Sequence, residues 1–346
     1  MLTGTPQRTV DAVLEEYGAV TSKALLECLP TGEPRRYLYD LVSDYPRRGG
    51  KMMRPSLCIA TTRAFGGTID QSLRSAVALE LLHNALLIKD DIEDGSEERR
   101  GRPTLHEQYG IPLAINAGDA MTLMSLKPLI ENTLSIGPSL CLRVLDETDR
   151  MARESAEGQA LELGWVRDNV TDLTEEDYLT MVLKKTCWLA TIFPLRVGAL
   201  IATRDQIDLD QFIRFGFFLG ASFQIHDDIL NLSAEDQRYG KEANGDIWEG
   251  KRTLMLIRLR RLATAAERKR IDAVMASPRN ERTDIDVRWI RSLMDHYGCI
   301  EYAREILHGI AGSAKNEFEL LFGQLPDSRD KRFLGEVVDW VFERSH

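Results

Sequence analysis

The helical character of this chain is clearest in residues 72–94, which read SLRSAVALELLHNALLIKDDIED. Apolar side chains recur there at spacings of three and four, at Val77, Leu81, Leu82, Ala85 and Leu86. That spacing places them along one broad stripe of an α-helix. The same pattern returns in residues 210–232, which read DQFIRFGFFLGASFQIHDDILNL. Both stretches are therefore predicted to be long helices, and each closes in an acidic segment.

The remaining sequence has the same helical period. Further helices are expected around residues 113–134, 141–163, 175–202, 283–296, 300–322 and 328–343. The breaks between them are rich in Gly, Pro, Asn or Asp, and none is long enough for an interdomain linker. Because no convincing series of alternating strands is visible, the sequence predicts one all-α domain over residues 1–346.

Composition excludes several classes of protein. The chain has 346 residues, of which 43% are hydrophobic and 28% charged, a balance typical of globular proteins. A net charge of −10 argues against a general nucleic-acid-binding surface. The five cysteines lie far apart without a CxxC pair, which favours reduced thiols. No run reaches the roughly 18 apolar residues of a membrane span, so we expect a cytoplasmic protein without one.

The two acidic segments are DDIED (90–94) and DDILN (227–231). Residues four apart on a helix are neighbours, so Asp90 and Asp94 present their oxygens to one place. Clustered carboxylates need cations, and Mg²⁺ binds through one or two carboxylates together with water and phosphate oxygens. One such segment alone is often only a solvated helix end. The pair predicts two helix ends that face one another and bind metal and diphosphate.

Cationic residues adjoin the first acidic segment. Arg99 and Arg100 follow it directly, and guanidinium groups match phosphate oxygens in pairs. Lys51 and Arg54 lie three apart, on one face of a starting helix, and His83 shares the helical face of the first aspartate. Each of these alone would be an ordinary surface or core residue. Their combination predicts a second anion pocket beside the metal-bound one.

Polar and cationic residues also occur near the second acidic segment. Lys185 and Thr186 interrupt an apolar helix, Gln224 precedes the second acidic segment by three residues, and Lys241 and Lys251 bracket the loop after it. Lysines in loops are usually solvated. Here they are predicted to converge on the two carboxylate clusters.

Together these motifs resemble one enzyme family, the trans-isoprenyl diphosphate synthases or polyprenyl synthetases, and within it geranylgeranyl diphosphate synthases most closely. The matching pieces are GGKMMRP (49–55), HNALLIKDDIED (83–94), RRGRPTLH (99–106), Gly158-Gln159, KKT (184–186), GASFQIHDDILN (220–231) and GKEANGDIWEGKRTL (240–254). The resemblance covers nearly the whole chain. It implies a single-domain, all-α isoprenoid-synthase-type helical bundle around a deep central cavity, and a homodimer.

The resemblance also implies roles for individual residues. Three Mg²⁺ ions would be held by Asp90, Asp94 and Asp227, with Asp91 in support. The allylic diphosphate would lie among Arg99, Lys185, Thr186, Gln224, Asp228, Lys241 and Lys251. Isopentenyl diphosphate would lie among Lys51, Arg54, His83 and Arg100. The catalytic set would be Asp90, Asp91, Asp94, Arg99, Lys185 and Asp227.

Two positions depart from the family pattern. Met52 stands where an arginine or a similar residue usually follows the first lysine, so the isopentenyl diphosphate pocket is expected to survive with altered support. Asn231 replaces the last aspartate of the second segment, keeping an oxygen acceptor but losing a charge. The same change is familiar among geranylgeranyl diphosphate synthases.

The expected chemistry is a head-to-tail condensation. Ionisation of the allylic C–O bond leaves a carbocation and a diphosphate, so positive charge is needed around the leaving oxygens. Product length is expected to depend on Leu82, Ala85 and Leu86, because the resemblance makes the position five residues before the first aspartate a floor for the growing chain. Small Ala85 leaves that floor open, and Leu82, Leu86 and residues near Met121 and Met124 are expected to close the tunnel deeper down. This favours a C20 product, geranylgeranyl diphosphate.

Three alternatives stay open. A class I terpene cyclase also has an aspartate-rich helix, but it has no use for the pocket at Lys51, Arg54 and His83, and no NDxxSxxxE motif is present. A non-catalytic synthase subunit would have lost acids or cations, and few are lost here. A polyprenyl diphosphate synthase of longer or shorter product length is the nearest competitor, since Ala85 permits chains beyond C20.

Overall fold

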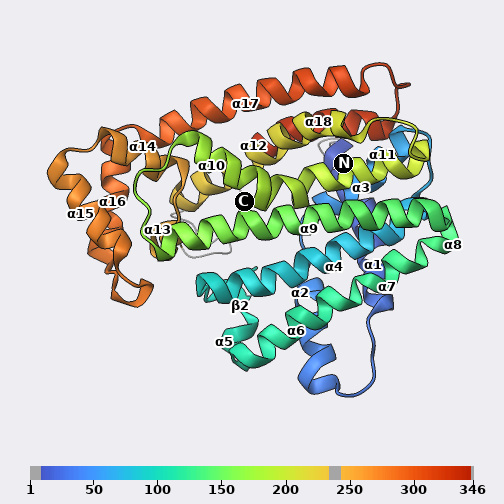
Figure 1. Cartoon of the computed structure of the whole chain (residues 1–346), viewed down its shortest axis with the longest axis horizontal. Helices are drawn as coiled ribbons and strands as arrows, with labels where there is room; N and C mark the ends of the chain where they lie inside the picture. Colours follow the sequence, from blue (N-terminus) through green and yellow to red (C-terminus); the bar gives the residue numbers. More distant parts are fainter. Residues whose placement is uncertain (1–8, 234–242, 344–346) are drawn as a thin grey trace, which may run out of the picture.

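The computed structural model describes residues 9–233 and 243–343, which are almost entirely helical (Figure 1). The first part consists of α1 (Thr9–Cys28), the π-helical η1 (Arg35–Tyr39), α2 (Asp40–Arg47), α3 (Met53–Ala64), α4 (Ile69–Asp94), β1 (Glu98–Arg99) and β2 (Arg102–Pro103). The second part consists of α5 (Leu105–Tyr109), α6 (Ile111–Met124), α7 (Leu126–Glu131), α8 (Thr133–Ile136) and α9 (Pro138–Arg167). Across the described residues, the only strands are the antiparallel β1 and β2, which confirms the all-α prediction.

The remaining elements complete the bundle. Before the gap lie α10 (Glu175–Val182), the π-helical η2 (Leu183–Ile192), α11 (Phe193–Thr203), the 3-10 helix η3 (Leu209–Gln211) and α12 (Phe212–Ser233). After it lie α13 (Gly245–Glu249), α14 (Leu254–Leu262), α15 (Ala265–Ala276), the 3-10 helix η5 (Arg279–Glu281), α16 (Asp284–His296), α17 (Cys299–Phe322) and α18 (Arg329–Glu343). The larger apolar core includes residues of α3, α9, η2, α11, α12 and α17, and a smaller one lies between α2, α4 and α6.

Helix α4 carries the first acidic segment to one end of the bundle, where α9 also ends (Figure 1). It starts at a capping box, in which the Thr68 backbone N–H donates to Gln71 Oε1 at 2.8 Å. It ends before Gly95, whose φ of 64° lies in the left-handed region that glycine adopts without strain. Residues 90–94 therefore occupy the last turn. Negative charge is unfavourable at a helix C-terminus, so these side chains need nearby cations.

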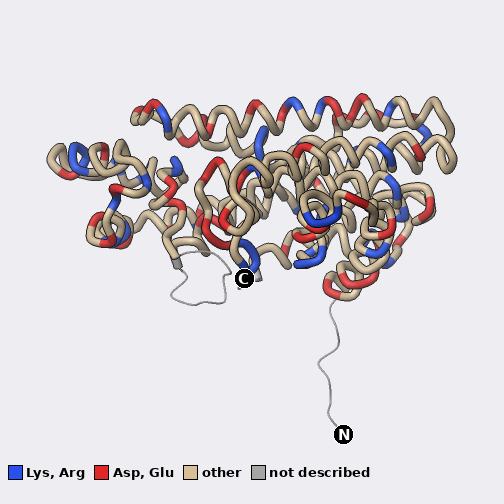
Figure 2. The backbone as a smooth tube through the Cα atoms, turned by 90° about the horizontal axis from the view of Figure 1, so that it is seen from below, with Lys and Arg blue, Asp and Glu red and all other residues tan. Residues whose placement is uncertain are grey.

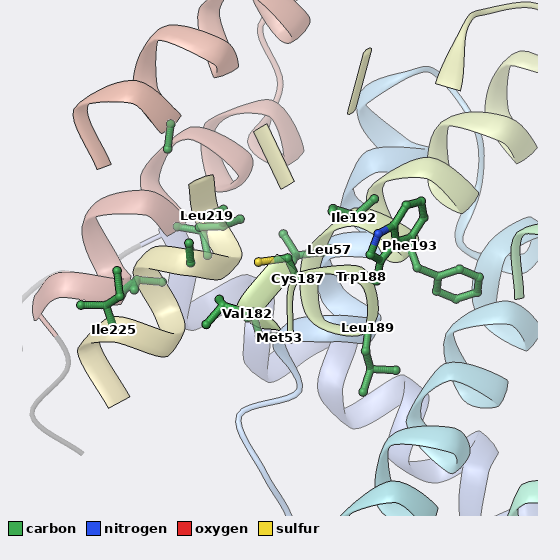
Figure 3. Packing of buried hydrophobic residues seen from close by; sticks show 14 of the residues in the cluster. Met53, Leu57, Val182, Cys187, Trp188, Leu189, Ile192, Phe193, Leu219 and Ile225 are labelled. Atoms are coloured by element: carbon green, nitrogen blue, oxygen red, sulfur yellow. The ribbon is translucent and has the colours of Figure 1, made fainter. Parts of the chain in front are cut away.

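The π-helix η2 lies between α9 and α12, and glycines let the backbones approach. A Cβ added to Gly158 of α9 would lie 2.1 Å from the backbone N of Lys185, and one on Gly220 of α12 would lie 2.8 Å from Cys187 Sγ. Cys187 and Trp188 project from η2 into the buried core around it (Figure 3). The first turn of η2 is thus fixed by close packing from two sides.

The helix expected at 175–202 forms as three consecutive pieces, α10, η2 and α11. The wide π-helical turns come directly before Pro194, which has no N–H to donate to the carbonyl four residues earlier. Residues 175–203 are long and apolar enough to cross a membrane by length and composition, yet 83% of the most apolar window is buried inside the protein. This run is therefore a core helix of the bundle.

The helix expected at 113–134 is divided into α6, α7 and α8. The first break falls after Met124, four residues before Pro128. A proline ring collides with the carbonyl four residues earlier and donates no hydrogen bond, so the regular helix is interrupted at this point. The apolar period continues across the break, which is why periodicity alone did not locate it.

Candidate active site

Lysines from distant segments pair with the acidic side chains at the end of α4. Lys185 Nζ lies 3.3 Å from Asp90 Oδ1 and also contacts Glu162. Lys251 Nζ lies 2.7 Å from Asp94 Oδ2. Although burial lowers the pKa of both lysines, the surrounding carboxylates more than offset it and leave each pKa above its ordinary value. Burial also raises the pKa of Asp94, against the opposing effect of Lys251.

Asp91 is fully buried and holds Arg99. Its Oδ1 accepts a hydrogen bond from Arg99 Nε at 2.9 Å and a second, shorter one from Nη2. Its Oδ2 accepts from the hydroxyl of Tyr45 at 2.5 Å. Buried carboxylates need such partners. Arg99 Nη2 is also 3.5 Å from Asp90 Oδ2, so Asp91 aligns this guanidinium beside the acidic cluster.

Arg99 and Arg100 are adjacent in sequence but enter different surroundings. The β1–β2 register pairs Arg99 with Arg102, which leaves Arg100 and Gly101 as a two-residue loop. Both loop residues have positive φ, 55° and 69°, as a type I′ turn requires. Burial lowers the pKa of the Arg100 guanidinium, and the carboxylate of Glu80 opposes that effect. The turn therefore directs one cation to the acidic cluster and the next toward Glu80.

A second cluster of charges surrounds the buried carboxylate of Glu80. Glu80 Oε1 lies 3.3 Å from His83 Nδ1. Burial lowers the pKa of His83 to about 4, and the charge of Arg54 acts in the same direction, so the imidazole is neutral near pH 7. The Nε of Arg54 is buried and has no hydrogen-bond partner among the described residues. Such an atom suits an oxygen of a bound anion.

The two remaining predicted cations are Lys51 and Lys241. Lys51 is exposed, and its ammonium lies 5.8 Å from the ring centre of Trp340 in α18. Lys241 falls in residues 234–242, outside the described residues. Their predicted contacts with diphosphate stay predictions.

The second acidic segment is joined to η2 by a chain of hydrogen bonds. Thr186 Oγ1 donates to Gln224 Oε1 at 2.8 Å, and Gln224 Nε2 donates to Asp228 Oδ1 at 2.7 Å. The hydroxyl of Tyr178 donates to Asp228 Oδ2 at 2.7 Å. Burial raises the pKa of Asp228 despite these bonds. Asp227 is only partly buried, and its charge acts on Arg54, so the second segment faces the same charged region.

Asn231 has a structural task. Its amide Oδ1 accepts a hydrogen bond from the backbone N–H of Asp246 at 3.1 Å, and its backbone carbonyl accepts from Asn244 at 3.0 Å. The side chain is buried. It therefore fixes the start of α13, the short helix before Lys251, through its amide oxygen.

Sequence reasoning missed several residues of the site. Glu162 contacts Lys185, and Glu249 Oε2 lies 2.6 Å from Lys251 Nζ. Glu80 lies beside His83, and Tyr178 donates a hydrogen bond to Asp228. Glu162 follows the Gly158-Gln159 pair by one helical turn, a signal that was available. The other carboxylates belong to helices whose register only the structure gives.

A cavity of about 660 Å³ opens beside these ion pairs. It is lined by residues of α4, α9, α13, α15 and η5 and of the loops beside them, among them Asp94, Glu162, Lys251 and Arg282. Acidic and basic positions lie side by side in the middle of the molecule when it is turned by 90° (Figure 2). The cavity thus lies where the charged ends of several helices meet.

The three predicted chain-length residues have different surroundings. Ala85 is fully buried in the core between α4 and α6, where its carbonyl oxygen would lie 3.5 Å from a Cβ on Gly118. Leu82 is partly buried against the larger core, and Leu86 is 37% exposed. Met121 is buried in the same core as Ala85. Their effect on product length stays a prediction.

The chain is similar to known proteins over almost all of its length. The family described as Polyprenyl synthetase matches residues 35–293. A geranylgeranyl pyrophosphate synthase of Geoglobus acetivorans is 30% identical, over 97% of this chain and 100% of that protein. The solved geranylgeranyl pyrophosphate synthetase of Pyrococcus horikoshii Ot3 has a TM-score of 0.84 and 31% identity, covering 97% and 98% of the two chains.

A second solved structure was determined with ligands. It is a polyprenyl synthase of Caulobacter crescentus CB15, complexed with calcium and isoprenyl diphosphate. Its TM-score is 0.84 and its identity 26%, with 99% of this chain and 100% of that one covered. The sequence match, the shared fold and the two charged clusters agree: this chain belongs to the polyprenyl synthetase family and is a trans-prenyltransferase.

Proposed function

We propose that the enzyme condenses isopentenyl diphosphate with allylic diphosphates, head to tail, to a C20 product. The observation that carries this proposal is the presence of two neighbouring groups of cations. One, with Lys185 and Lys251, lies at the acidic end of α4, and the other, with Arg54 and Arg100, lies around Glu80. Two diphosphates need two such places, whereas a terpene cyclase needs one.

The acidic residues fit a hard divalent cation. Their donors are carboxylate oxygens, and in the part of the chain that the structure describes no three His, Cys, Asp or Glu side chains form a ready metal cage. That suits Mg²⁺, which binds through few carboxylates and completes its shell with water and phosphate oxygens. We assign Asp90, Asp94 and Asp227 as the protein ligands of Mg²⁺, and we propose three ions in each active site. When bound, it supplies Lewis-acid neutralisation of the diphosphate oxygens.

The protein's own groups have complementary tasks. Arg99, Lys185 and Lys251 place fixed positive charge where the leaving diphosphate becomes more negative. The Thr186–Gln224 pair presents side-chain dipoles beside the site, which stabilise an allylic cation without bonding to it. Arg54 and Arg100 hold the second diphosphate, and neutral His83 adds a hydrogen-bonding group without charge. The apolar residues proposed to line the tunnel for the growing chain exclude water, which would quench the cation.

The decisive experiment is one set of incubations. Purified protein, Mg²⁺ and isopentenyl diphosphate are combined with dimethylallyl, geranyl or farnesyl diphosphate, and the products are sized by mass. We expect elongation of at least one starter to C20. A hydrocarbon released from a prenyl diphosphate without elongation would indicate a cyclase, and no product with any starter would indicate a non-catalytic subunit.

Ala85→Phe is expected to shorten the product, and Ala85→Val to do so partially. The larger side chain would narrow the space beside α6, where Ala85 is already fully buried. Chromatography of the dephosphorylated products measures the length, and a melting curve shows whether overpacking has unfolded the variant. If folded Ala85→Phe protein makes the wild-type length distribution, Ala85 is not the floor of the cavity.

The proposal includes a homodimer and one polyprenyl synthetase domain over residues 1–346. Large apolar side chains are exposed on the consecutive elements α6 to α9, at Ile111, Ile115, Leu123, Leu126, Ile130, Leu134 and Leu142. Such a row is typical of a surface covered by a second copy. A cytoplasmic location is also part of the proposal and is supported by five cysteines that are all free.

Charge on the apolar row is expected to separate the subunits. Leu123 and Leu134 are 67% and 78% exposed, so the double variant Leu123→Glu, Leu134→Glu changes no core packing within one chain. Sedimentation should give twice the 39.2 kDa chain mass for the wild type and the single mass for the variant. Leu320→Glu, at an equally exposed leucine of α17, is the control and should remain dimeric.

A further inference from the structure

Arg48, the residue after α2, is tied to the hairpin that carries the two guanidinium groups. Its Nη1 donates to the carbonyl oxygens of Arg99 at 3.0 Å and Arg102 at 3.3 Å, and its Nη2 donates to that of Pro103 at 2.8 Å. Its Nε donates to Asp44 Oδ1 at 2.5 Å. The Arg48 side chain is only 1% exposed, so nearly all its donors serve the protein rather than solvent.

Tyr45, one helical turn earlier, contacts the same hairpin differently. Its hydroxyl donates to Asp91 Oδ2 at 2.5 Å, and Asp91 in turn holds Arg99. Its backbone carbonyl accepts from Arg100 Nη1 at 3.0 Å. The guanidinium of Arg48 lies 4.6 Å from the centre of the Tyr45 ring, within the range of a cation–π contact. Tyr45 thus contacts Arg100 directly and Arg99 through Asp91.

The hairpin needs external support. Each strand has two residues, and an isolated two-stranded hairpin is at best marginally stable in water. A planar guanidinium with fixed donors can hold several carbonyl oxygens at once, which the single ammonium of lysine cannot reproduce. Burying that charge is favourable only when its donors are satisfied, and Arg48 meets this condition through Asp44 and three carbonyls.

We propose that Arg48 and Tyr45 are positioning residues, which set the directions of Arg99 and Arg100 and thereby prepare both diphosphate sites together. Arg48 fixes the hairpin backbone and so acts on both guanidinium groups. The Tyr45 hydroxyl acts on Arg99 alone, through Asp91, because Arg100 bonds to the Tyr45 backbone carbonyl. This inference rests on the proposed assignment of Arg99 to the allylic diphosphate and Arg100 to isopentenyl diphosphate.

The first test is Arg48→Met, with Arg47→Met as the matched control at the exposed arginine beside it. We expect KM for both diphosphates to rise about tenfold in Arg48→Met, the effect of losing about 1.4 kcal/mol of binding free energy from each. Assays are run well below the melting temperature of each variant. The control should keep both KM values within about twofold of the wild type, since a twofold change is under about 0.5 kcal/mol.

The second test separates the two sites without removing Arg48. Tyr45→Phe keeps the ring and the backbone carbonyl but loses the hydroxyl. KM for the allylic substrate should therefore rise about fivefold, or about 1 kcal/mol, the typical net contribution of one hydrogen bond. KM for isopentenyl diphosphate should stay within about twofold. If Arg48→Met does not fold, Tyr45→Phe still tests the proposal.

The outcomes are distinct. Wild-type KM values in folded Arg48→Met, with only kcat or melting temperature lowered, would assign Arg48 to stability alone and overturn the inference. Equal rises of both KM values in Tyr45→Phe would overturn the separate action of its hydroxyl. If the wild type itself elongates no starter, the proposed function fails instead, before any variant is compared.

Discussion

Gly158→Ala is expected to lower the stability of the enzyme by about 3 kcal/mol, at the upper end of overpacking effects. The added Cβ would lie 2.1 Å from the backbone N and 2.6 Å from the Cα of Lys185. These are backbone atoms of η2, so no side-chain rotation relieves the collision. Separation of α9 from η2 would also move Lys185 away from Asp90, so kcat should fall as well. Chemical denaturation and steady-state kinetics measure the two effects.

The same helix provides the control. Gly164 of α9 has an ordinary helical φ, and a Cβ there would meet nothing within 4 Å. Gly164→Ala should therefore raise stability by about 0.5 to 1 kcal/mol, the difference in helix propensity between the two residues. Equal effects of the two substitutions would show that α9 and η2 are not in the close contact described here.

Asp90→Asn is expected to lower kcat about a thousandfold, which corresponds to about 4 kcal/mol in the activation free energy. The amide keeps the shape of the side chain but loses the charge assigned to hold the metal. Stability should change little, because Asp90 lies in the last turn of α4, where a negative charge is unfavourable. Lys185 keeps Glu162 as a partner in the variant. Initial rates over a range of Mg²⁺ and substrate concentrations measure the effect.

An exposed aspartate supplies the comparison. Asp119 of α6 pairs with Lys89 at 2.8 Å and its side chain is 59% exposed, so Asp119→Asn removes the same charge outside the acidic cluster. Its kcat should stay within about twofold of the wild type, as for most surface substitutions. A kcat of Asp90→Asn that matched this control would remove Asp90 from the metal assignment.

Periodicity predicted the long helices because a helix that buries one face needs apolar residues at spacings of three and four. That spacing can be seen in the sequence alone. It did not locate the break at Pro128, since apolar spacing continues through it. Nor did it reveal the π-helix η2, which depends on the missing N–H of Pro194 and on glycines of two other helices. Those contacts join segments far apart in the chain.

The sequence could place Asp90 and Asp94 together at one helix end, because a motif groups residues of one kind there; their role in metal binding stays a prediction. The site was not predictable where one side chain of a motif turns inward: Asp91 is buried under Arg99, and Asn231 holds the start of α13. The sequence spacing of adjacent aspartates says nothing about which one is buried. The supporting residues Glu80 and Arg48 belong to no recognisable motif. Their roles in the site arise only when separate segments of the chain pack together.

The pairing of Lys185 and Lys251 with the end of α4 has a consequence for the order of events. Each ammonium pairs with an aspartate of that helix end, so a divalent ion binding the same carboxylate would compete with a lysine. A diphosphate arriving with the ion offers those lysines new anionic oxygens. Under the proposed function, such an exchange would be nearly neutral in charge, so metal and substrate would bind more readily together than singly.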